Sequence, residues 1–319
     1  MNYRRMGRWG LKLSEISLGA WLTFGDDVDE KTAERMLHLA YDKGINFFDN
    51  ADVYQGGRAE EVMGAAMRGL PRTALVVSSK VFWRTLPGPN GQGLSRKHIL
   101  ESCHASLRRL GTDYLDLYFC HRFDGETPLD ETVQVMDDLV RQGKILYWGT
   151  SEWTAEQIER AMDIAMQAGH APPAVEQPQY NLLIRRVVEA TLVPLADRVG
   201  IGLVTWSPLR SGLLSGKYNA ASGSKARLRR KEYNWLGDIL SEANLTVARG
   251  LAEVAGDLGC TPAQLAIGWL LRTSQVTSVI TGATSTAQLE ENLGAAEVPG
   301  RLTPGVLSRI ESLVSGRAS

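Results

Sequence analysis

The sequence predicts an α/β fold of the (β/α)8 class, a TIM barrel, on three observations. Short apolar runs that suit buried parallel strands alternate with amphipathic helical patterns along the chain. The alternation gives eight strand–helix units, and neither half of the chain duplicates the other. No Gly-x-Gly-x-x-Gly follows any of the apolar runs, which disfavours the alternative of a doubly wound open sheet.

The expected strands are mostly continuous apolar runs, as suits parallel strands that are buried on both faces. They are expected over residues 16–20, 45–49, 74–80, 114–121, 145–150, 174–179, 201–206 and 277–282. Residues 1–15 predict a small β-hairpin ahead of the barrel, because Gly7 and Gly10 supply a turn and Leu11 and Leu13 alternate with polar residues. The longest irregular stretch is expected at about 209–240, after strand seven.

Helices are expected between the strands, and several carry start and stop signals. Residues 31–43 place their apolar side chains on one face, and residues 95–110 stop at Gly111. Thr127 followed by Pro128 predicts a cap with proline at the first helical position. Capping boxes are expected at Thr154, Thr261 and Ser285.

Composition indicates an ordinary globular protein, with 44% hydrophobic and 22% charged residues among 319. The formal net charge of −1 gives no basic surplus for nucleic acid. No apolar run approaches the roughly 18 residues of a membrane span, and the N-terminus lacks the apolar segment of a signal peptide. The three cysteines are widely spaced and fit neither a disulfide framework nor a metal site. We therefore expect a single barrel domain over residues 1–319, cytoplasmic, without metal, nucleic acid or membrane.

Candidate catalytic residues follow from the strand ends, because a (β/α)8 barrel carries its site at the carboxyl ends of its strands. Asp49 ends strand two with Tyr54 in the loop beyond it, Lys80 ends strand three, and His121 ends strand four. A buried lysine needs a counter-charge, which Asp49 can supply. The lysine is expected to lower the pKa of Tyr54 from about 10, and His121 is expected to hydrogen-bond a carbonyl. Each residue alone also suits a structural role, and only their order favours catalysis.

The order Asp-x4-Tyr, Lys and His at successive strand ends resembles the aldo-keto reductases. Four further motifs add to the resemblance: Gly-Thr-Ser-Glu-Trp at 149–153, Glu-Gln at 176–177, Thr-Trp-Ser-Pro-Leu at 205–209 and Gln-Leu-Glu-Glu-Asn at 288–292. Residues 91–99 and 214–218 are similar to the branch that includes voltage-gated potassium-channel beta subunits and their bacterial relatives. The resemblance covers nearly the whole chain, from about residue 7 to residue 297.

The resemblance implies an NADPH-dependent reductase that converts aldehydes and ketones to alcohols. Tyr54 would then be the general acid, Lys80 paired with Asp49 would tune it, and His121 would orient the carbonyl. The substrate pocket is expected to contain Trp21, Tyr54, Trp83 and His121.

Contacts with NADP(H) are also implied by the resemblance, with Ser151 and Gln177 at the nicotinamide carboxamide and Trp206 stacked on its ring. The full expected set is Trp21, Asp49, Ser151, Gln177, Trp206, Ser207, Pro208, Leu209, Gly212, Lys217, Arg227, Gly282, Thr284, Gln288, Glu291 and Asn292. The loop at about 209–240 would cover the cofactor, and Arg227 is a candidate for the 2′-phosphate of NADP, although the basic run at 225–231 also suits a solvated loop. The basic pair that many family members place near Gly282 and Gln288 is absent, so NAD(H) stays open.

Two rival functions stay open. The first is an NADPH-binding regulatory or redox-sensing subunit with little turnover, as the channel subunits imply. His121, where some channel subunits have Asn, favours turnover. The second rival is a cofactor-free barrel isomerase or lyase. The branch includes monomers and larger assemblies, so a homo-oligomer stays open, as does the identity of the carbonyl substrate.

Overall fold

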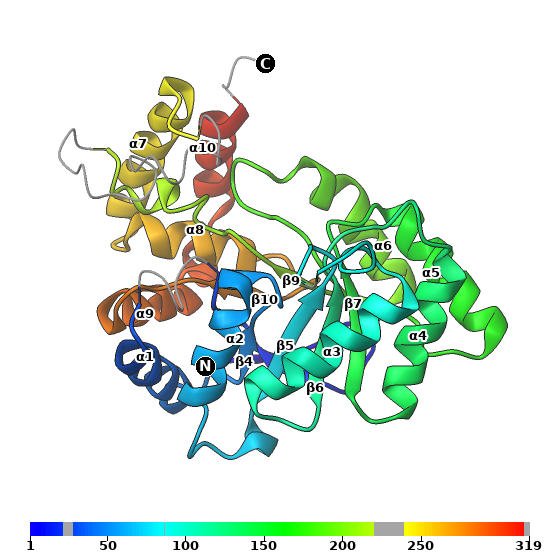
Figure 1. The fold of residues 1–319 in the computed structure, drawn as a ribbon. Coiled ribbons are helices and arrows are strands. Elements are labelled where there is room, and N and C mark those ends of the chain that lie inside the picture. Colours follow the sequence, from blue (N-terminus) through cyan, green and yellow to red (C-terminus); the bar gives the residue numbers. More distant parts are fainter. Residues whose placement is uncertain (22–27, 86, 220–238, 316–319) are drawn as a thin grey trace. The chain divides into compact units, whose positions relative to one another are not determined.

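A closed barrel of eight parallel strands forms the centre of the fold (Figure 1). The computed structural model describes residues 1–21, 28–85, 87–219 and 239–315. The strands follow the order β10-β3-β4-β5-β6-β7-β8-β9. Their bounds are β3 Ile16–Gly19, β4 Phe47–Asp49, β5 Val76–Val81, β6 Leu115–Cys120, β7 Ile145–Ser151, β8 Val175–Gln177, β9 Gly202–Thr205 and β10 Val276–Thr281. The predicted (β/α)8 fold is confirmed, and each expected strand overlaps an observed one.

The predicted hairpin at the N-terminus is also confirmed. Strands β1 (Tyr3–Arg5) and β2 (Lys12–Ser14) pair antiparallel. The turn between them passes so close to the barrel that a Cβ on Gly7 would lie 2.1 Å from the carbonyl oxygen of Gly200, at a φ of 55°.

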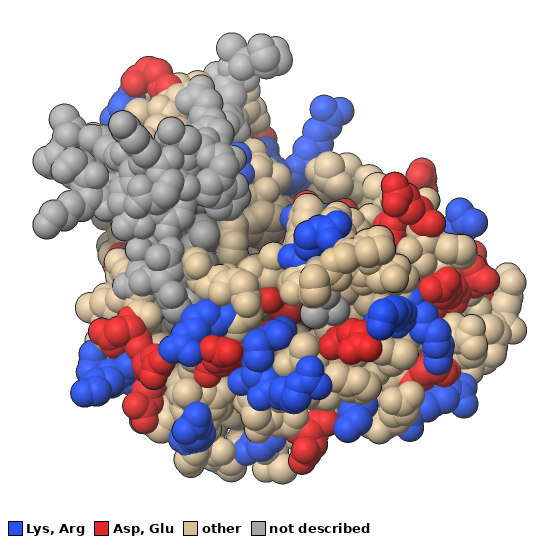
Figure 2. Space-filling view, in the orientation of Figure 1, with Lys and Arg blue, Asp and Glu red and all other residues tan. Residues whose placement is uncertain are grey.

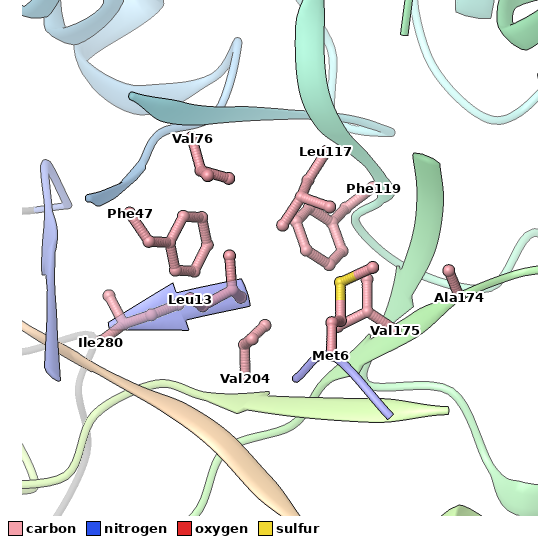
Figure 3. Close-up of a cluster of buried hydrophobic side chains, with 10 residues drawn as sticks. All are labelled: Met6, Leu13, Phe47, Val76, Leu117, Phe119, Ala174, Val175, Val204 and Ile280. Carbon is pink, nitrogen blue, oxygen red and sulfur yellow. The ribbon is translucent and has the colours of Figure 1, made fainter. Parts of the chain in front are cut away.

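The hairpin contributes to the barrel core. Figure 3 shows Met6 and Leu13 among the inward side chains of the strands, including Phe47 and Val204, and both are fully buried. The cluster includes Val76 and Val175, the first residues of their strands, so the hairpin plugs the end where the strands begin. The opposite end, where the strands finish, is left for a site.

Helices cover the outside of the barrel strands. They are α1 Glu30–Asp42, α2 Arg58–Ala66, α3 Arg96–Leu110, α4 Leu129–Arg141, α5 Ala155–Ala168 and α6 Val193–Val199. Ser95 caps α3, and Thr154 forms the predicted capping box of α5. The predicted start of α4 is wrong by one residue: Pro128 precedes the helix, and the Thr127 hydroxyl donates to Asp124 instead of capping.

The contacts of the chain divide it into two compact units. The first comprises Met1–Pro178, Arg186–Thr205 and Gln275–Leu289 and holds the barrel strands. The second comprises Gln179–Arg185, Trp206–Ser274 and Glu290–Ser319. Its elements include η4 Leu213–Ser215, α7 Glu242–Asp257, α8 Pro262–Leu271 and α10 Pro304–Ser315.

A separate small core holds the second unit together, with Leu213, Ile239 and Ala248 buried. Thr261 forms the predicted capping box of α8. Helix α9 (Thr286–Leu293) crosses the boundary between the units, and the Ser285 hydroxyl accepts from the Gln288 N–H at its start. Part of the expected long loop, residues 220–238, lies outside the described residues.

Charges on the surface are mixed in sign. On the face drawn in Figure 2, basic and acidic side chains are interspersed. Exposed pairs such as Lys97 with Glu101 and Arg301 with Glu297 contribute little to stability individually, because water screens them. Among the helices of the described ranges, none is both long and apolar enough to cross a membrane.

Candidate active site

Polar side chains that share the inward face with the barrel core form the candidate site. Successive residues of a strand point to opposite faces, so a residue two positions after a core residue also points inward. Phe47 is followed in this way by Asp49, Phe119 by His121 and Val175 by Gln177, and the first of each pair belongs to the core cluster. Because these strands end together, their last inward residues meet at one rim of the barrel.

Lys80 occupies the centre of this group. Its ammonium donates to Oδ2 of Asp49 at 2.6 Å, to the carbonyl oxygen of Asn50 at 2.7 Å and to Oη of Tyr54 at 3.3 Å. The Lys80 side chain is 0% exposed and that of Asp49 is 4% exposed. Burial lowers the pKa of Lys80 from its ordinary value, and the Asp49 carboxylate opposes that shift.

The other oxygen of Asp49 is also satisfied. Ser78 donates its hydroxyl to Oδ1 at 2.8 Å, and Gln177 donates Nε2 to the same atom at 3.0 Å. A buried ion pair is stable when hydrogen bonds satisfy its remaining lone pairs. Sequence reasoning missed Ser78, although its position two residues before Lys80 placed it on the same face.

A strained turn places Tyr54 above the ion pair. Tyr54 begins the short helix η1 (Tyr54–Gly57), in which Gln55, Gly56 and Gly57 have φ values of 49°, 61° and 95°. Left-handed backbone at a non-glycine residue such as Gln55 is unfavourable and often marks a functional segment. The turn brings the Tyr54 ring centroid to 4.9 Å from Nζ of Lys80 and 5.9 Å from the His121 ring.

The electrostatics of the group differ from one expectation. Burial, with the Asp49 carboxylate adding to it, raises the pKa of Tyr54 well above its ordinary value of 10.0. The expected lowering of that pKa by Lys80 is therefore wrong, because a rule for charge pairs ignores the desolvation of a buried phenol. Tyr54 consequently stays protonated across the neutral range.

His121 is neutral in the same range. Burial lowers its pKa well below 6.5, and the positive charges of Lys80 and Arg122 add to the effect. Its Nδ1 is buried and has no hydrogen-bond partner among the residues that the structure describes. A neutral imidazole with an unsatisfied nitrogen fits a ligand that supplies a polar atom.

Asp52, the acid nearest to Tyr54 in the sequence, belongs to a second polar cluster. It is 1% exposed, and burial, followed by the charge of Glu60, raises its pKa to about 8. Glu60 is itself buried and accepts from Nε of Arg109 at 2.6 Å and from Oγ of Ser79 at 2.5 Å. The Lys80 ammonium donates to Asp49, Asn50 and Tyr54, so its counter-ion is Asp49 and not Asp52.

The cofactor residues expected in the barrel unit lie at three places, all at or after the ends of barrel strands. Ser151 ends β7 and donates its hydroxyl to the carbonyl oxygen of Gln177 at 2.9 Å, so both lie beside Asp49. Trp21 is half-buried after β3. After β10, the Gln288 side-chain oxygen accepts from the Thr284 N–H at 2.9 Å and from its hydroxyl at 3.0 Å, near exposed Gly282.

Several of the remaining expected residues lie in the second unit, in a loop of unusual backbone. Ser207, Arg210 and Ser211 have φ values of 57°, 47° and 56°, and Gly212 follows at 89°. A Cβ on Gly212 would lie 2.4 Å from Nζ of Lys217. The Lys217 side chain can therefore occupy this position only because Gly212 has no side chain.

Strained backbone and a space that only glycine leaves fit a loop that approaches a bound cofactor closely. Trp206, Pro208 and Leu209 belong to the same loop, with Trp206 half-buried, and Asn292 is buried next to Glu291 elsewhere in the unit. Arg227 lies outside the described residues.

Comparison with known proteins identifies the family of the chain. The aldo/keto reductase family model matches residues 15–315. A probable voltage-gated potassium channel subunit beta from Arabidopsis thaliana is 48% identical over 321 residues, which cover 99% of this chain and 98% of the relative. A protein of the same description from Oryza sativa subsp. japonica is 47% identical over 322 residues, at the same coverage. With its barrel and these relatives, the chain belongs to the aldo/keto reductase family of oxidoreductases.

Proposed function

We propose that the protein reduces aldehydes and ketones to alcohols with NADPH. The observation that carries the proposal is the placement of one ammonium, that of Lys80, between the Asp49 carboxylate and the Tyr54 hydroxyl, beside a neutral His121. The group holds a proton donor, a charge that stabilises the donor's anion, and a neutral hydrogen-bond donor. Such a set suits proton transfer to a carbonyl oxygen.

Tyr54 is proposed as the general acid. The Lys80 ammonium carries donors only, so the Tyr54 oxygen accepts from it and keeps its own proton for another partner. The raised pKa keeps that proton in place until the carbonyl oxygen gains negative charge. When the proton leaves, the nearby ammonium stabilises the phenolate, which solvent then reprotonates.

His121 is proposed to orient the carbonyl. Its pKa lies well below 6.5, so it is a hydrogen-bond donor at neutral pH and not a competing acid. It lies edge-on to the Tyr54 ring, with 5.9 Å between centroids. One carbonyl oxygen placed between the two rings would accept a hydrogen bond from each.

The cofactor supplies the hydride that the carbonyl carbon receives, and NADPH is oxidised as the alcohol forms. Ser151 and Gln177 are proposed to bind its carboxamide, because both lie beside Asp49 at the strand ends. In the second unit the left-handed loop from Ser207 to Gly212, with Lys217, is proposed to bind the pyrophosphate. Lys217 would supply the positive charge that two phosphates require.

The decisive experiment is a panel of simple aldehydes assayed with the purified chain and either NADPH or NADH. We expect turnover with NADPH, measured as loss of the reduced-nicotinamide absorbance. Tyr54→Phe should lower kcat by roughly 100- to 10,000-fold, while cofactor binding, followed by quenching of tryptophan fluorescence, changes little. Unchanged turnover in Tyr54→Phe would refute the proposed acid.

A regulatory subunit is the second candidate, because the relatives carry the description of potassium channel subunits. In that case the protein would bind NADPH tightly and reduce no aldehyde of the panel at a useful rate. The same assays separate the two candidates, since cofactor binding with steady-state turnover supports the enzyme and binding alone supports the subunit.

A further inference from the structure

Next to the catalytic group lies a guanidinium that no carboxylate of the described residues neutralises. Arg122 directly follows His121, and its Nη1 donates to the His121 carbonyl oxygen at 2.5 Å. The guanidinium carbon lies 5.6 Å from the centroid of the Trp83 ring. No carboxylate within the described ranges forms an ion pair with it, and of its five donors one has a hydrogen bond there.

The nearest acid in sequence is committed elsewhere. Asp124 accepts from the N–H groups of Leu94 and Glu126 and from the Thr127 hydroxyl, at 2.7–2.9 Å. These bonds lower the pKa of Asp124 and hold its carboxylate in the turn before α4. Its role is therefore to shape that loop, and it does not form an ion pair with Arg122.

The catalytic group itself supplies no net negative charge. Lys80 and Asp49 cancel each other as a pair at 2.6 Å, while Tyr54 and His121 are neutral. Glu60 is paired with Arg109, and Asp52 is protonated at neutral pH. Among the residues that the structure describes, the charge of Arg122 is thus not balanced by an opposite charge, and it acts on Tyr54, Lys80 and His121 alike.

Trp83 provides an apolar surface between the catalytic group and this charge. Its ring centroid lies 6.3 Å from that of His121, and Phe82 supports it edge-on at 5.0 Å. The side chain is 38% exposed although it lies near both Phe82 and His121, so part of its ring is open to a ligand. An apolar spacer lying along Trp83 would therefore run from His121 toward the guanidinium.

We propose that Arg122 and Trp83 select aldehydes that carry a carboxylate on the far side of an apolar or aromatic spacer. This inference rests on the proposed function. The carbonyl end is reduced as described, with the hydride added to carbon and the Tyr54 proton to oxygen, and the carboxylate passes through unchanged. Arg122 binds the carboxylate with the planar fork that suits two oxygens, and Trp83 packs against the spacer.

The test compares two aldehydes of nearly the same shape, para-carboxybenzaldehyde and its neutral amide, para-formylbenzamide. The wild-type chain should show a higher kcat/KM for the carboxylate, mainly through a lower KM. Arg122→Gln should reduce the ratio of the two kcat/KM values by roughly 10- to 100-fold, as expected for a lost charged hydrogen bond. Arg122→Lys, which keeps the charge but loses the fork, should retain an intermediate ratio.

Arg84→Gln is the matched control, because Arg84 is exposed on the loop that follows Trp83 and donates to the Gly88 carbonyl. It should leave the ratio at the wild-type value. Added salt should lower the carboxylate's kcat/KM and spare the amide's. Equal ratios in the wild type and Arg122→Gln would overturn the inference while the reductase proposal stands. If the chain reduced neither of these two aldehydes and no other aldehyde of the panel, both the reductase proposal and this inference would be refuted.

Discussion

Lys80 and Asp49 form an ion pair in which Nζ and Oδ2 lie 2.6 Å apart and almost no part of either side chain reaches solvent. Each charge therefore depends on the other for its stability. The pair also carries the proposed chemistry, since the same ammonium donates to Tyr54. Stability and the proposed catalysis at this position therefore both depend on a single nitrogen atom, Nζ of Lys80.

The first prediction concerns this ion pair. Lys80→Met and Asp49→Asn should each lower the free energy of unfolding by about 3–5 kcal/mol, because each leaves one uncompensated buried charge. The double variant should be less destabilised than the sum of the two, since it removes both charges. Denaturant unfolding of the four proteins measures the coupling as a double-mutant cycle. Additive losses would show that the two side chains do not interact in solution.

The second prediction concerns the acidic limb of the pH profile of kcat/KM. His121 has its pKa well below 6.5, so it is neutral at neutral pH and gains a proton only as the pH falls further. Protonation would add a positive charge beside Lys80 and Arg122 and disturb the orientation of the carbonyl. We expect kcat/KM for reduction to be level down to a pH well below 6.5 and then to fall.

His121→Asn supplies a donor that does not titrate in this range. The kcat of this variant should fall by roughly 10- to 100-fold, which is less than the loss caused by removing a hydrogen-bond donor from an oxyanion hole. The decrease of kcat/KM at acidic pH should disappear. An acidic limb that persists unchanged in His121→Asn would assign it to another group.

Much of the site follows from the sequence because buried parallel strands make a regular pattern. Asp49 and His121 could be placed on the inward face because each lies two residues after an apolar residue of the core. The hairpin and the capping boxes at Thr154 and Thr261 were likewise confirmed, because glycine turns and Thr-x-x-Gln pairs have local causes. The box expected at Ser285 is only half formed, because the Gln288 side chain accepts from Thr284 instead. Such signals need no knowledge of the tertiary structure.

Other features depend on contacts that the sequence does not encode locally. Ser78 and the carbonyl oxygen of Asn50 bind the ion pair. The strand period places Ser78 on the same face as Lys80, but neither the residue type nor the period shows that its hydroxyl donates to Asp49, and a backbone oxygen leaves no signal in the sequence. The predicted lowering of the Tyr54 pKa is wrong, because the effect of burial outweighs that of the neighbouring Lys80 charge. Arg122 carries no signal in the sequence, because its proposed role depends on the lack of an ion-pair partner among the described residues, which only the structure shows.

The third prediction concerns the turn that holds Tyr54. Gly57 has a φ of 95°, and a Cβ there would lie 2.9 Å from the side chain of Arg109. Arg109 is held by its ion pair with buried Glu60, so it cannot withdraw freely. Gly57→Ala should lower the free energy of unfolding by about 2–3 kcal/mol, from backbone strain and a disturbed ion pair, and should lower kcat as Tyr54 shifts.

Gly56→Ala is the matched control, because Gly56 also has a positive φ, 61°, but no atom lies within 4 Å of its Cβ position. It should lower the free energy of unfolding by only about 1 kcal/mol. Thermal unfolding and aldehyde turnover of both variants make the comparison. Equal losses of unfolding free energy in the two variants would show that the Arg109 side chain moves aside at no energetic cost.

The fourth prediction concerns Glu176, which lies in β8 beside Gln177 but on the opposite face. Burial raises its pKa from 4.5 to about 8, although a hydrogen bond from the Thr150 hydroxyl, at 2.5 Å, opposes the shift. Between these two pH values the folded protein holds a proton on Glu176 that the unfolded chain has released. Unfolding therefore releases a proton in this window, and the contribution of Glu176 to stability falls as the pH rises through it.

Glu176→Gln removes the titration while keeping the shape of the side chain. Relative to this variant, the wild type should lose roughly 4 kcal/mol of unfolding free energy as the pH rises from 4.5 to 8. Denaturant unfolding at several pH values measures the difference. Glu152→Gln, a change at an exposed neighbour whose charge adds to the Glu176 shift, should keep most of the wild-type slope. If the unfolding free energies of the wild type and Glu176→Gln changed in parallel with pH, Glu176 would be ionised in the folded protein throughout this range. Its buried charge would then be stabilised by its surroundings.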